Sequence, residues 1–155
     1  MANVKLGSHP SHGYAVVEKL DGAKQLSRSD SGKMFMIDQS AAFTINLPKL
    51  GTEVAGWQAK FVVKTAASND VHIMGWGLTS AGGTGDSGAT NDGDVMVLKE
   101  MATTDAGAAT ATSQDGAILK SGATVGDSID IFTDGSVWYA TSYVADAAHS
   151  DDIDG

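Results

Sequence analysis

Two stretches of polar residues have the types and spacing of known catalytic motifs. Residues 85–88 read Gly-Asp-Ser-Gly, the string that surrounds the nucleophilic serine of chymotrypsin-like proteases. The next residue is Ala89 rather than glycine. The upstream histidines His9, His12 and His72 lie in no context that matches a catalytic triad. We therefore predict a surface loop at residues 85–88, and we interpret the Gly-Asp-Ser string of residues 126–128 in the same way.

Two further groups resemble parts of metal sites. His9 and His12 are three residues apart, and their imidazoles could hold a divalent cation if a third ligand came from elsewhere. The sequence nominates no such ligand. Residues 91–94, Asn-Asp-Gly-Asp, resemble half of a calcium loop but lack its spacing and its bidentate glutamate. We therefore predict no metal and no cofactor, a polar arm around the histidines, and turn residues at 91–94.

The three tryptophans divide into two kinds. Trp57 and Trp138 alternate in phase with apolar neighbours, and we expect both in the core. Trp76 stands between Gly75 and Gly77 directly after an expected strand. Its ring either packs back over a sheet edge or is offered to a partner, as large aromatic side chains often are at interfaces.

Residues 126–139 carry the clearest structural signal, a β-hairpin. Asp134-Gly135 tolerates positive φ in a tight turn and stands between two runs rich in β-branched and aromatic residues. If these two residues are the whole loop, Thr133 pairs with Ser136 and Ile131 pairs with Trp138. One face of the hairpin is then apolar. A hairpin of this kind folds only against more strands, so the sequence predicts a small all-β domain.

The rest of the chain supplies other strand-like runs and two terminal segments. We expect strands at residues 14–17, 33–37, 43–47, 57–64, 70–74 and 94–99. Residues 79–93 predict a long surface loop, and residues 101–115 show no clear period. The predicted fold is a single-domain β-sandwich or open β-barrel of about eight short strands. An extended N-terminal arm (1–25) precedes this β domain (26–143), and a solvated acidic tail (144–155) follows it.

Composition narrows the functional classes. The chain has 155 residues, a net charge of −9 and no cysteine, which excludes disulfides and thiol chemistry. The excess of acidic residues argues against a nucleic-acid partner, because phosphates would be repelled. No window is apolar enough for a membrane span, and the first residues lack the apolar region of a secretory signal, so we expect no membrane partner and synthesis in the cytoplasm.

Residues 26–38 read Leu-Ser-Arg-Ser-Asp-Ser-Gly-Lys-Met-Phe-Met-Ile-Asp, and residues 43–48 read Phe-Thr-Ile-Asn-Leu-Pro. Together these two stretches resemble an opening found in small β-rich virion proteins of tailed bacteriophages. The hairpin of residues 126–139 resembles their closing strands, and residues 56–63, Gly-Trp-Gln-Ala-Lys-Phe-Val-Val, fit the same pattern. The resemblance covers roughly residues 26–143.

Proteins of this type are commonly capsid decoration or cement proteins. The resemblance therefore implies a non-enzymatic structural protein on the outer capsid surface of the virion, where a homotrimer would bridge neighbouring subunits of the major capsid protein. Candidate contacts with the capsid or between subunits are His9, His12, Tyr14 and Trp76. As a hypothesis, the arm reaches across the coat surface or a sister subunit and orders there as an added β-strand.

Two other functions stay open. Similar modules occur in tail fibres and other appendages, and such a module would present Trp76 and the Gly-rich loop to host-surface carbohydrate. An enzyme is the third alternative, but the sequence shows no convergent acid and base, no cysteine and no phosphate-binding loop. We therefore predict that the protein is not an enzyme.

Overall fold

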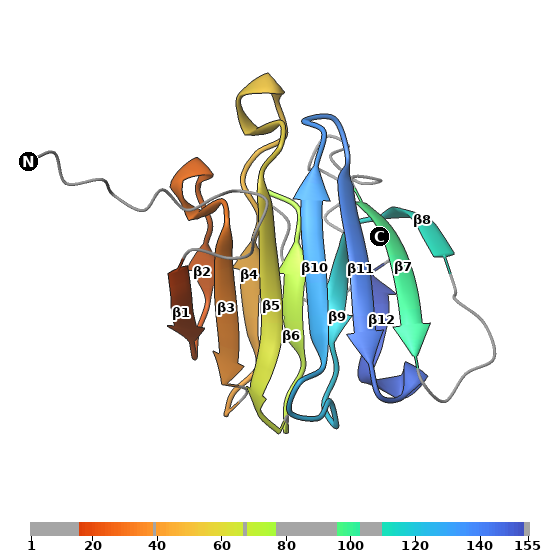
Figure 1. The fold of residues 1–155 in the computed structure, drawn as a ribbon. Coiled ribbons are helices and arrows are strands. Elements are labelled where there is room, and N and C mark those ends of the chain that lie inside the picture. Colours follow the sequence, from red (N-terminus) through yellow and green to blue (C-terminus); the bar gives the residue numbers. More distant parts are fainter. Residues whose placement is uncertain (1–15, 39, 67, 77–95, 103–109, 154–155) are drawn as a thin grey trace, which may run out of the picture.

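The computed structural model describes residues 16–38, 40–66, 68–76, 96–102 and 110–153. These residues form twelve β-strands and three short 3₁₀ helices, and Figure 1 shows the strands in two sheets, one in front of the other. The predicted all-β fold is confirmed. The two inner faces share one core, which gives the domain the layers of a β-sandwich.

The larger sheet has seven strands in the order β1-β3-β5-β10-β11-β7-β8. Its strands are β1 (Val16–Leu20), β3 (Lys33–Asp38), β5 (Gln58–Thr65), β10 (Ser128–Thr133), β11 (Trp138–Val144), β7 (Met96–Ala102) and β8 (Thr110–Gln114). The smaller sheet has five strands in the order β12-β9-β6-β4-β2. They are β12 (Ser150–Ile153), β9 (Gly116–Leu119), β6 (Val71–Met74), β4 (Phe43–Asn46) and β2 (Lys24–Gln25). The 3₁₀ helices are η1 (Arg28–Asp30), η2 (Thr52–Val54) and η3 (Ala147–His149).

The first six strands enter the two sheets alternately. Strands β1, β3 and β5 pair in parallel in the larger sheet, and β2, β4 and β6 pair in parallel in the smaller one. Each connection therefore crosses from one sheet to the other. Parallel neighbours place equivalent residues side by side, so Phe35 pairs with Phe61 and their rings stack with centroids 5.2 Å apart.

The core lies between the sheets and is built from alternate residues of the strands. Trp57 and Trp138 are both buried, as predicted, and their rings meet edge to face with centroids 5.2 Å apart. The indole nitrogen of Trp57 donates a hydrogen bond of 3.0 Å to the carbonyl oxygen of Ser27. This bond ties the turn before β3 to the start of β5.

The predicted hairpin is present, but its register differs by two residues. Thr133 pairs with Trp138 and Ile131 pairs with Ala140, so the loop has four residues, 134–137, instead of two. The Asp134 carboxylate accepts hydrogen bonds from the backbone N–H groups of Ser136, at 2.8 Å, and Val137, at 3.1 Å. This side-chain turn competes with the two-residue turn. Because strand side chains alternate with a period of two, the apolar face is unchanged.

The predicted terminal segments need correction. Residues 16–20 and 24–25 of the predicted arm form β1 and β2, and residues 150–153 of the predicted solvated tail pair with β9. The prediction was based on the pattern of apolar residues. Edge strands are held in the sheet by backbone hydrogen bonds, so they need few apolar residues and leave little of that pattern. For the same reason the number of strands was underestimated, since the structure has twelve in its described residues. The unassigned stretch 101–115 contributes the end of β7, all of β8 and Asp115 before β9.

Candidate functional site

Of the four predicted contact residues, the structure describes only Trp76. His9, His12 and Tyr14 lie outside the described residues, as do the motifs at 85–88 and 91–94. Trp76 follows β6 and is 46% exposed, with the Lys49 ammonium 5.4 Å from the centroid of its ring. The lysine covers part of one ring face by a cation–π contact. Trp76 is therefore a surface residue rather than a core residue, and its ring already has a polar neighbour.

A larger candidate surface is the side of the seven-stranded sheet that faces away from the core, which we call the outer face. Three cross-strand rows of side chains lie on it, and many of them are apolar or aromatic. The first row runs Gln58, Phe132, Tyr139 and Val97. The second runs Val17, Met34, Lys60, Asp130, Thr141 and Lys99, and the third runs Lys19, Met36, Val62, Ser128, Tyr143 and Met101.

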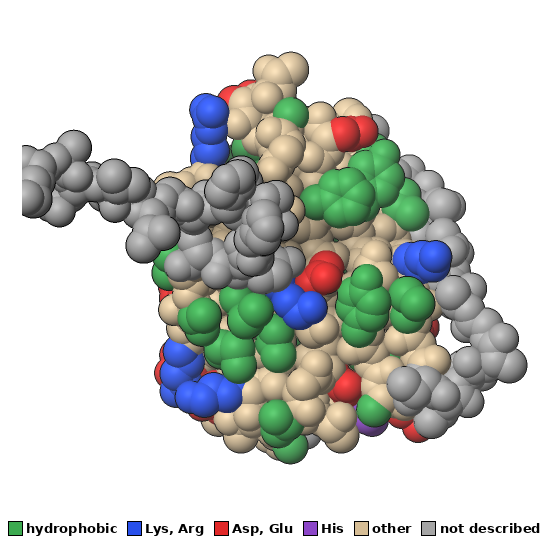
Figure 2. Space-filling model, in the orientation of Figure 1, with side chains coloured by type: hydrophobic (Ala, Val, Ile, Leu, Met, Phe, Trp, Pro, Cys, Tyr) green, Lys and Arg blue, Asp and Glu red, His purple; other side chains and the backbone are tan. Residues whose placement is uncertain are grey.

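The space-filling view confirms that apolar side chains gather on this face. Figure 2 shows several green groups over the strands of the larger sheet, with few acidic side chains among them. Among these residues Val17 is 64% exposed, Phe132 51%, Met101 45% and Tyr143 44%. Large apolar side chains exposed together on one face are unusual for a protein surface that contacts only water. The outer face is therefore the strongest candidate for a binding surface.

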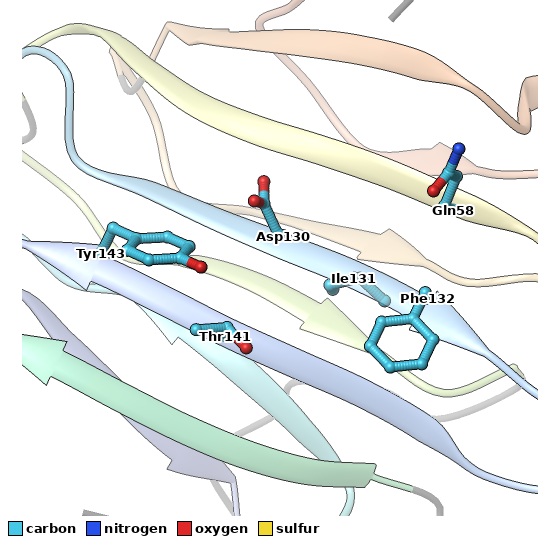
Figure 3. A pocket seen from close by; sticks show the side chains of 6 residues that line it. All are labelled: Gln58, Asp130, Ile131, Phe132, Thr141 and Tyr143. Carbon is cyan, nitrogen blue, oxygen red and sulfur yellow. The ribbon is translucent and has the colours of Figure 1, made fainter. Parts of the chain in front are cut away.

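A shallow hollow of about 270 Å³ lies at the centre of the outer face. Figure 3 shows the rings of Phe132 and Tyr143 toward opposite ends of it, with Asp130 and Thr141 between them and Gln58 on the neighbouring strand. Along the strand direction the backbone positions of these two residues are four residues, or about 13 Å, apart. The hollow thus has two aromatic walls and a polar centre, which suits a partner with apolar groups at both ends and polar groups between them.

Contacts within the face hold these side chains in place. The rings of Phe132 and Tyr139 stack with centroids 5.0 Å apart, at an interplanar angle of 17°. Lys60 Nζ lies 3.2 Å from Asp130 Oδ1, and the same ammonium lies 5.5 Å from the ring centroid of Tyr143. One lysine therefore links the polar centre of the hollow to its aromatic wall. Side chains that are already ordered lose less entropy on binding.

Ion pairs close the edge of the sandwich beside β1 and β2. Lys33 Nζ lies 2.9 Å from Glu18 Oε2 and 2.5 Å from Asp30 Oδ1, and Lys24 pairs with Glu18 on the other side. Hydrogen bonds from Lys24 and Lys33 lower the pKa of Glu18. Burial by itself raises the pKa of Asp30, but hydrogen bonds from Lys33 and Ser27 leave it below its usual value. The network keeps its carboxylates ionised at the open edge, so its role is structural.

One histidine and carboxylate pair has the residue types of a catalytic dyad. His149 Nδ1 donates to Asp127 Oδ2 at 2.8 Å, and the Asp127 side chain is only 5% exposed. The same carboxylate accepts from the backbone N–H groups of Thr124, at 2.8 Å, and Ala145, at 2.9 Å. It is therefore engaged in joining β10, β11 and η3. We assign this pair to the fold rather than to chemistry.

Among the described residues, no three histidine, aspartate or glutamate side chains come close enough together to hold a metal ion. No helix in that part of the chain has the length and apolar character to cross a membrane.

Comparison with protein-family models, with curated proteins and with solved structures found no match for this chain.

Sequence reasoning missed the residues of the outer face, although a signal was present. In the hairpin, Ile129, Ile131 and Trp138 alternate with Phe132 and Tyr139. In a two-sheet domain without covering helices, only one face of each strand can lie in the core. A strand that is apolar on both faces therefore exposes apolar side chains on its outer face. The exposed positions of Phe132 and Tyr139 could therefore have been predicted from the sequence of the hairpin.

Proposed function

We propose that this protein is a non-enzymatic capsid decoration or cement protein, which binds the outer surface of an assembled phage capsid and bridges neighbouring coat subunits. The observation that carries the proposal is the outer face. The inner faces of the two sheets already form a complete core, so the exposed rows around Phe132 and Tyr143 are available to a partner. The resemblance of residues 26–143 to small phage virion proteins supports the capsid as that partner.

The proposed mechanism is adhesive. A subunit or a closed homotrimer sits where coat subunits meet, so that separating those subunits must also break its contacts. A protein that binds the assembled lattice but not the separated coat subunits stabilises the lattice by mass action. This mechanism requires a preformed surface, which the outer face would provide.

Co-sedimentation with capsids that lack this protein tests the proposal. We expect saturable binding at a fixed ratio to coat subunits, and mass photometry of the free protein should show a trimer. Capsids with the protein bound should also resist heat better than bare capsids. Absence of binding to bare, expanded capsids would refute the proposal.

The arm is a second element of the proposal. β1 is an edge strand of the seven-stranded sheet, and residues 1–15, with His9, His12 and Tyr14, lead into that edge. We propose that these residues reach the coat surface or a sister subunit. Deleting residues 2–13 should then lower capsid occupancy, and unchanged occupancy would contradict this role.

Host-surface carbohydrate is the alternative ligand, and the hollow favours it. Phe132 and Tyr143 could stack on sugar rings while Gln58, Asp130 and Thr141 provide polar partners, an arrangement suited to a tail-fibre or appendage module. This function predicts affinity for a glycan without any capsid. A glycan array with the wild-type protein and Phe132→Ala would separate it from the capsid proposal.

A further inference from the structure

We infer that the outer face docks onto an acidic protein surface, and that electrostatic attraction orients this contact. The inference rests on the proposed capsid function and identifies both the docking face and the chemistry of the coat surface that receives it. It follows from an unequal distribution of charge between this face and the rest of the chain.

The outer face is less acidic than the rest of the chain. Its three rows, with Asp21, Asp38, Lys64 and Asp134 beside them, carry four lysines and four aspartates, so the described part of this face is neutral in a chain whose net charge is −9. The other three lysines are Lys19, Lys60 and Lys99, and the fourth aspartate is Asp130. Lys19 pairs with Asp21 and with Asp38, each at 3.1 Å, Lys60 pairs with Asp130 at 3.2 Å, and Asp134 accepts from the Tyr139 hydroxyl at 3.3 Å.

The two remaining lysines of the face have no acidic partner among the described residues. Lys64 and Lys99 are exposed, and neither forms an ion pair with a described residue. They lie on β5 and β7, on either side of the hairpin that supplies Phe132 and Tyr143. Two unpaired cations thus flank an aromatic centre, which is the arrangement of an interface with an apolar core and a charged rim. Carboxylates on the partner would form ion pairs with both lysines.

The distribution of charge also selects among partners. A nucleic acid would meet the field of the whole chain, which is strongly negative, and on this face only two lysines that lack an ion pair with a described residue. A second copy docked face to face would offer no unpaired carboxylate to Lys64 or Lys99, because the described aspartates of the face already have partners. An acidic protein surface with apolar groups complements the face in both respects. Rim charges of this kind act mainly on the association rate and on its dependence on salt.

Charge reversal at the two unpaired lysines tests the inference. The variant Lys64→Glu/Lys99→Glu should bind bare capsids at least about tenfold more weakly than the wild type in low salt. The control Arg28→Glu/Ser40→Glu/Ala41→Glu changes the net charge by the same four units, two at the arginine and one at each neutral residue, at exposed positions outside the strands of the outer face. It should bind like the wild type. Co-sedimentation between about 0.05 and 0.5 M NaCl should also show a flatter salt dependence for the first variant.

The outcomes separate this inference from the proposed function. Wild-type binding that both variants weaken equally, or that neither weakens, would refute the docking face and leave the capsid function standing. Absence of wild-type binding at every salt concentration would refute both. Mass photometry of the free proteins adds a further test: if only Lys64→Glu/Lys99→Glu dissociates the oligomer, a second copy occupies the face and the inference is wrong. Thermal unfolding of each variant confirms that it is folded.

Discussion

Replacing Asp127 should strongly destabilise the domain, because this carboxylate holds three elements together. Its Oδ1 accepts from the N–H of Ala145, which follows β11, at 2.9 Å. Its Oδ2 accepts from the N–H of Thr124 at 2.8 Å, from the Thr124 hydroxyl at 3.2 Å, and from His149 Nδ1 at 2.8 Å. The residue is buried and directly precedes β10. Asp127→Ala would leave two backbone donors and the histidine without their acceptor.

The expected loss follows from those bonds. Each buried donor left unsatisfied costs about 1–3 kcal/mol, so Asp127→Ala should lower the free energy of unfolding by about 4 kcal/mol. Asp127→Asn keeps one carbonyl oxygen and should lose less, about 2 kcal/mol. Urea unfolding followed by tryptophan fluorescence measures both, since Trp57 and Trp138 are buried. The control Asp21→Asn removes a carboxylate whose side chain is 65% exposed and should cost less than about 1 kcal/mol.

A loss below about 1 kcal/mol for Asp127→Ala would refute this reasoning. It would mean that water replaces the carboxylate at these donors, or that the segment from 145 to 149 detaches at little cost. Amide hydrogen exchange at Ala145 distinguishes these two explanations, since only detachment removes its protection.

Three further predictions concern the turns and the dependence of stability on pH. Gly135 has a φ of 98°, and a Cβ there would lie 2.9 Å from the carbonyl oxygen of Gly51, so Gly135→Ala should cost about 1–3 kcal/mol in urea unfolding. Gly22→Ala, where a Cβ would meet nothing within 4 Å, should change stability by less than about 1 kcal/mol. Burial lowers the pKa of His72 below 6.5, so the unfolded chain binds more protons and stability should fall as the pH drops below 6.5. His72→Gln should remove that part of the slope, and an unchanged slope would contradict the assignment. Hydrogen bonds from Ser136 and Val137 lower the pKa of Asp134 from 3.8 to about 2, so its contribution should be present above pH 3.8 and lost as the pH falls toward 2. Acid unfolding of Asp134→Ala should therefore show a shallower decline over that range than acid unfolding of the wild type.

The fold class could be predicted because local patterns determine it. The alternation in residues 57–64 and the buried positions of the hairpin depend only on which residues point to the core. The pairing of strands that are separated in the sequence is not encoded by any such local pattern. The parallel neighbours β3 and β5 are joined through β4 in the other sheet, and no local turn signal specifies that path. The two-residue error in the hairpin has a similar cause, since Asp134 forms its turn with Val137 through its side chain.

The terminal strands show what sequence patterns cannot reveal. β12 contains Ser150, two aspartates and Ile153, a composition typical of a solvated tail. Its place is fixed by contacts with other parts of the chain. Ser150 Oγ donates to Ser142 Oγ at 3.1 Å, and Lys120 Nζ lies 2.5 Å from Asp151 Oδ2. Each of these partners is unremarkable in sequence, and only the folded arrangement brings them together.

The net charge of this chain does not show how charged side chains are distributed over its surface. Taken from composition alone, a net charge of −9 indicates solubility and argues against polyanionic partners. It says nothing of a face on which lysines are as numerous as aspartates. Side chains that point outward from adjacent strands come from residues such as Lys64 and Lys99, which are far apart in the sequence. Their neighbours Phe132 and Tyr143 are exposed because the core is complete without them. A sheet that is apolar on both sides would be a liability in an isolated acidic protein, since other copies could adhere to it. On a lattice with an acidic surface, the same features favour one orientation of docking and leave the negatively charged remainder facing the solvent, where it keeps neighbouring particles apart.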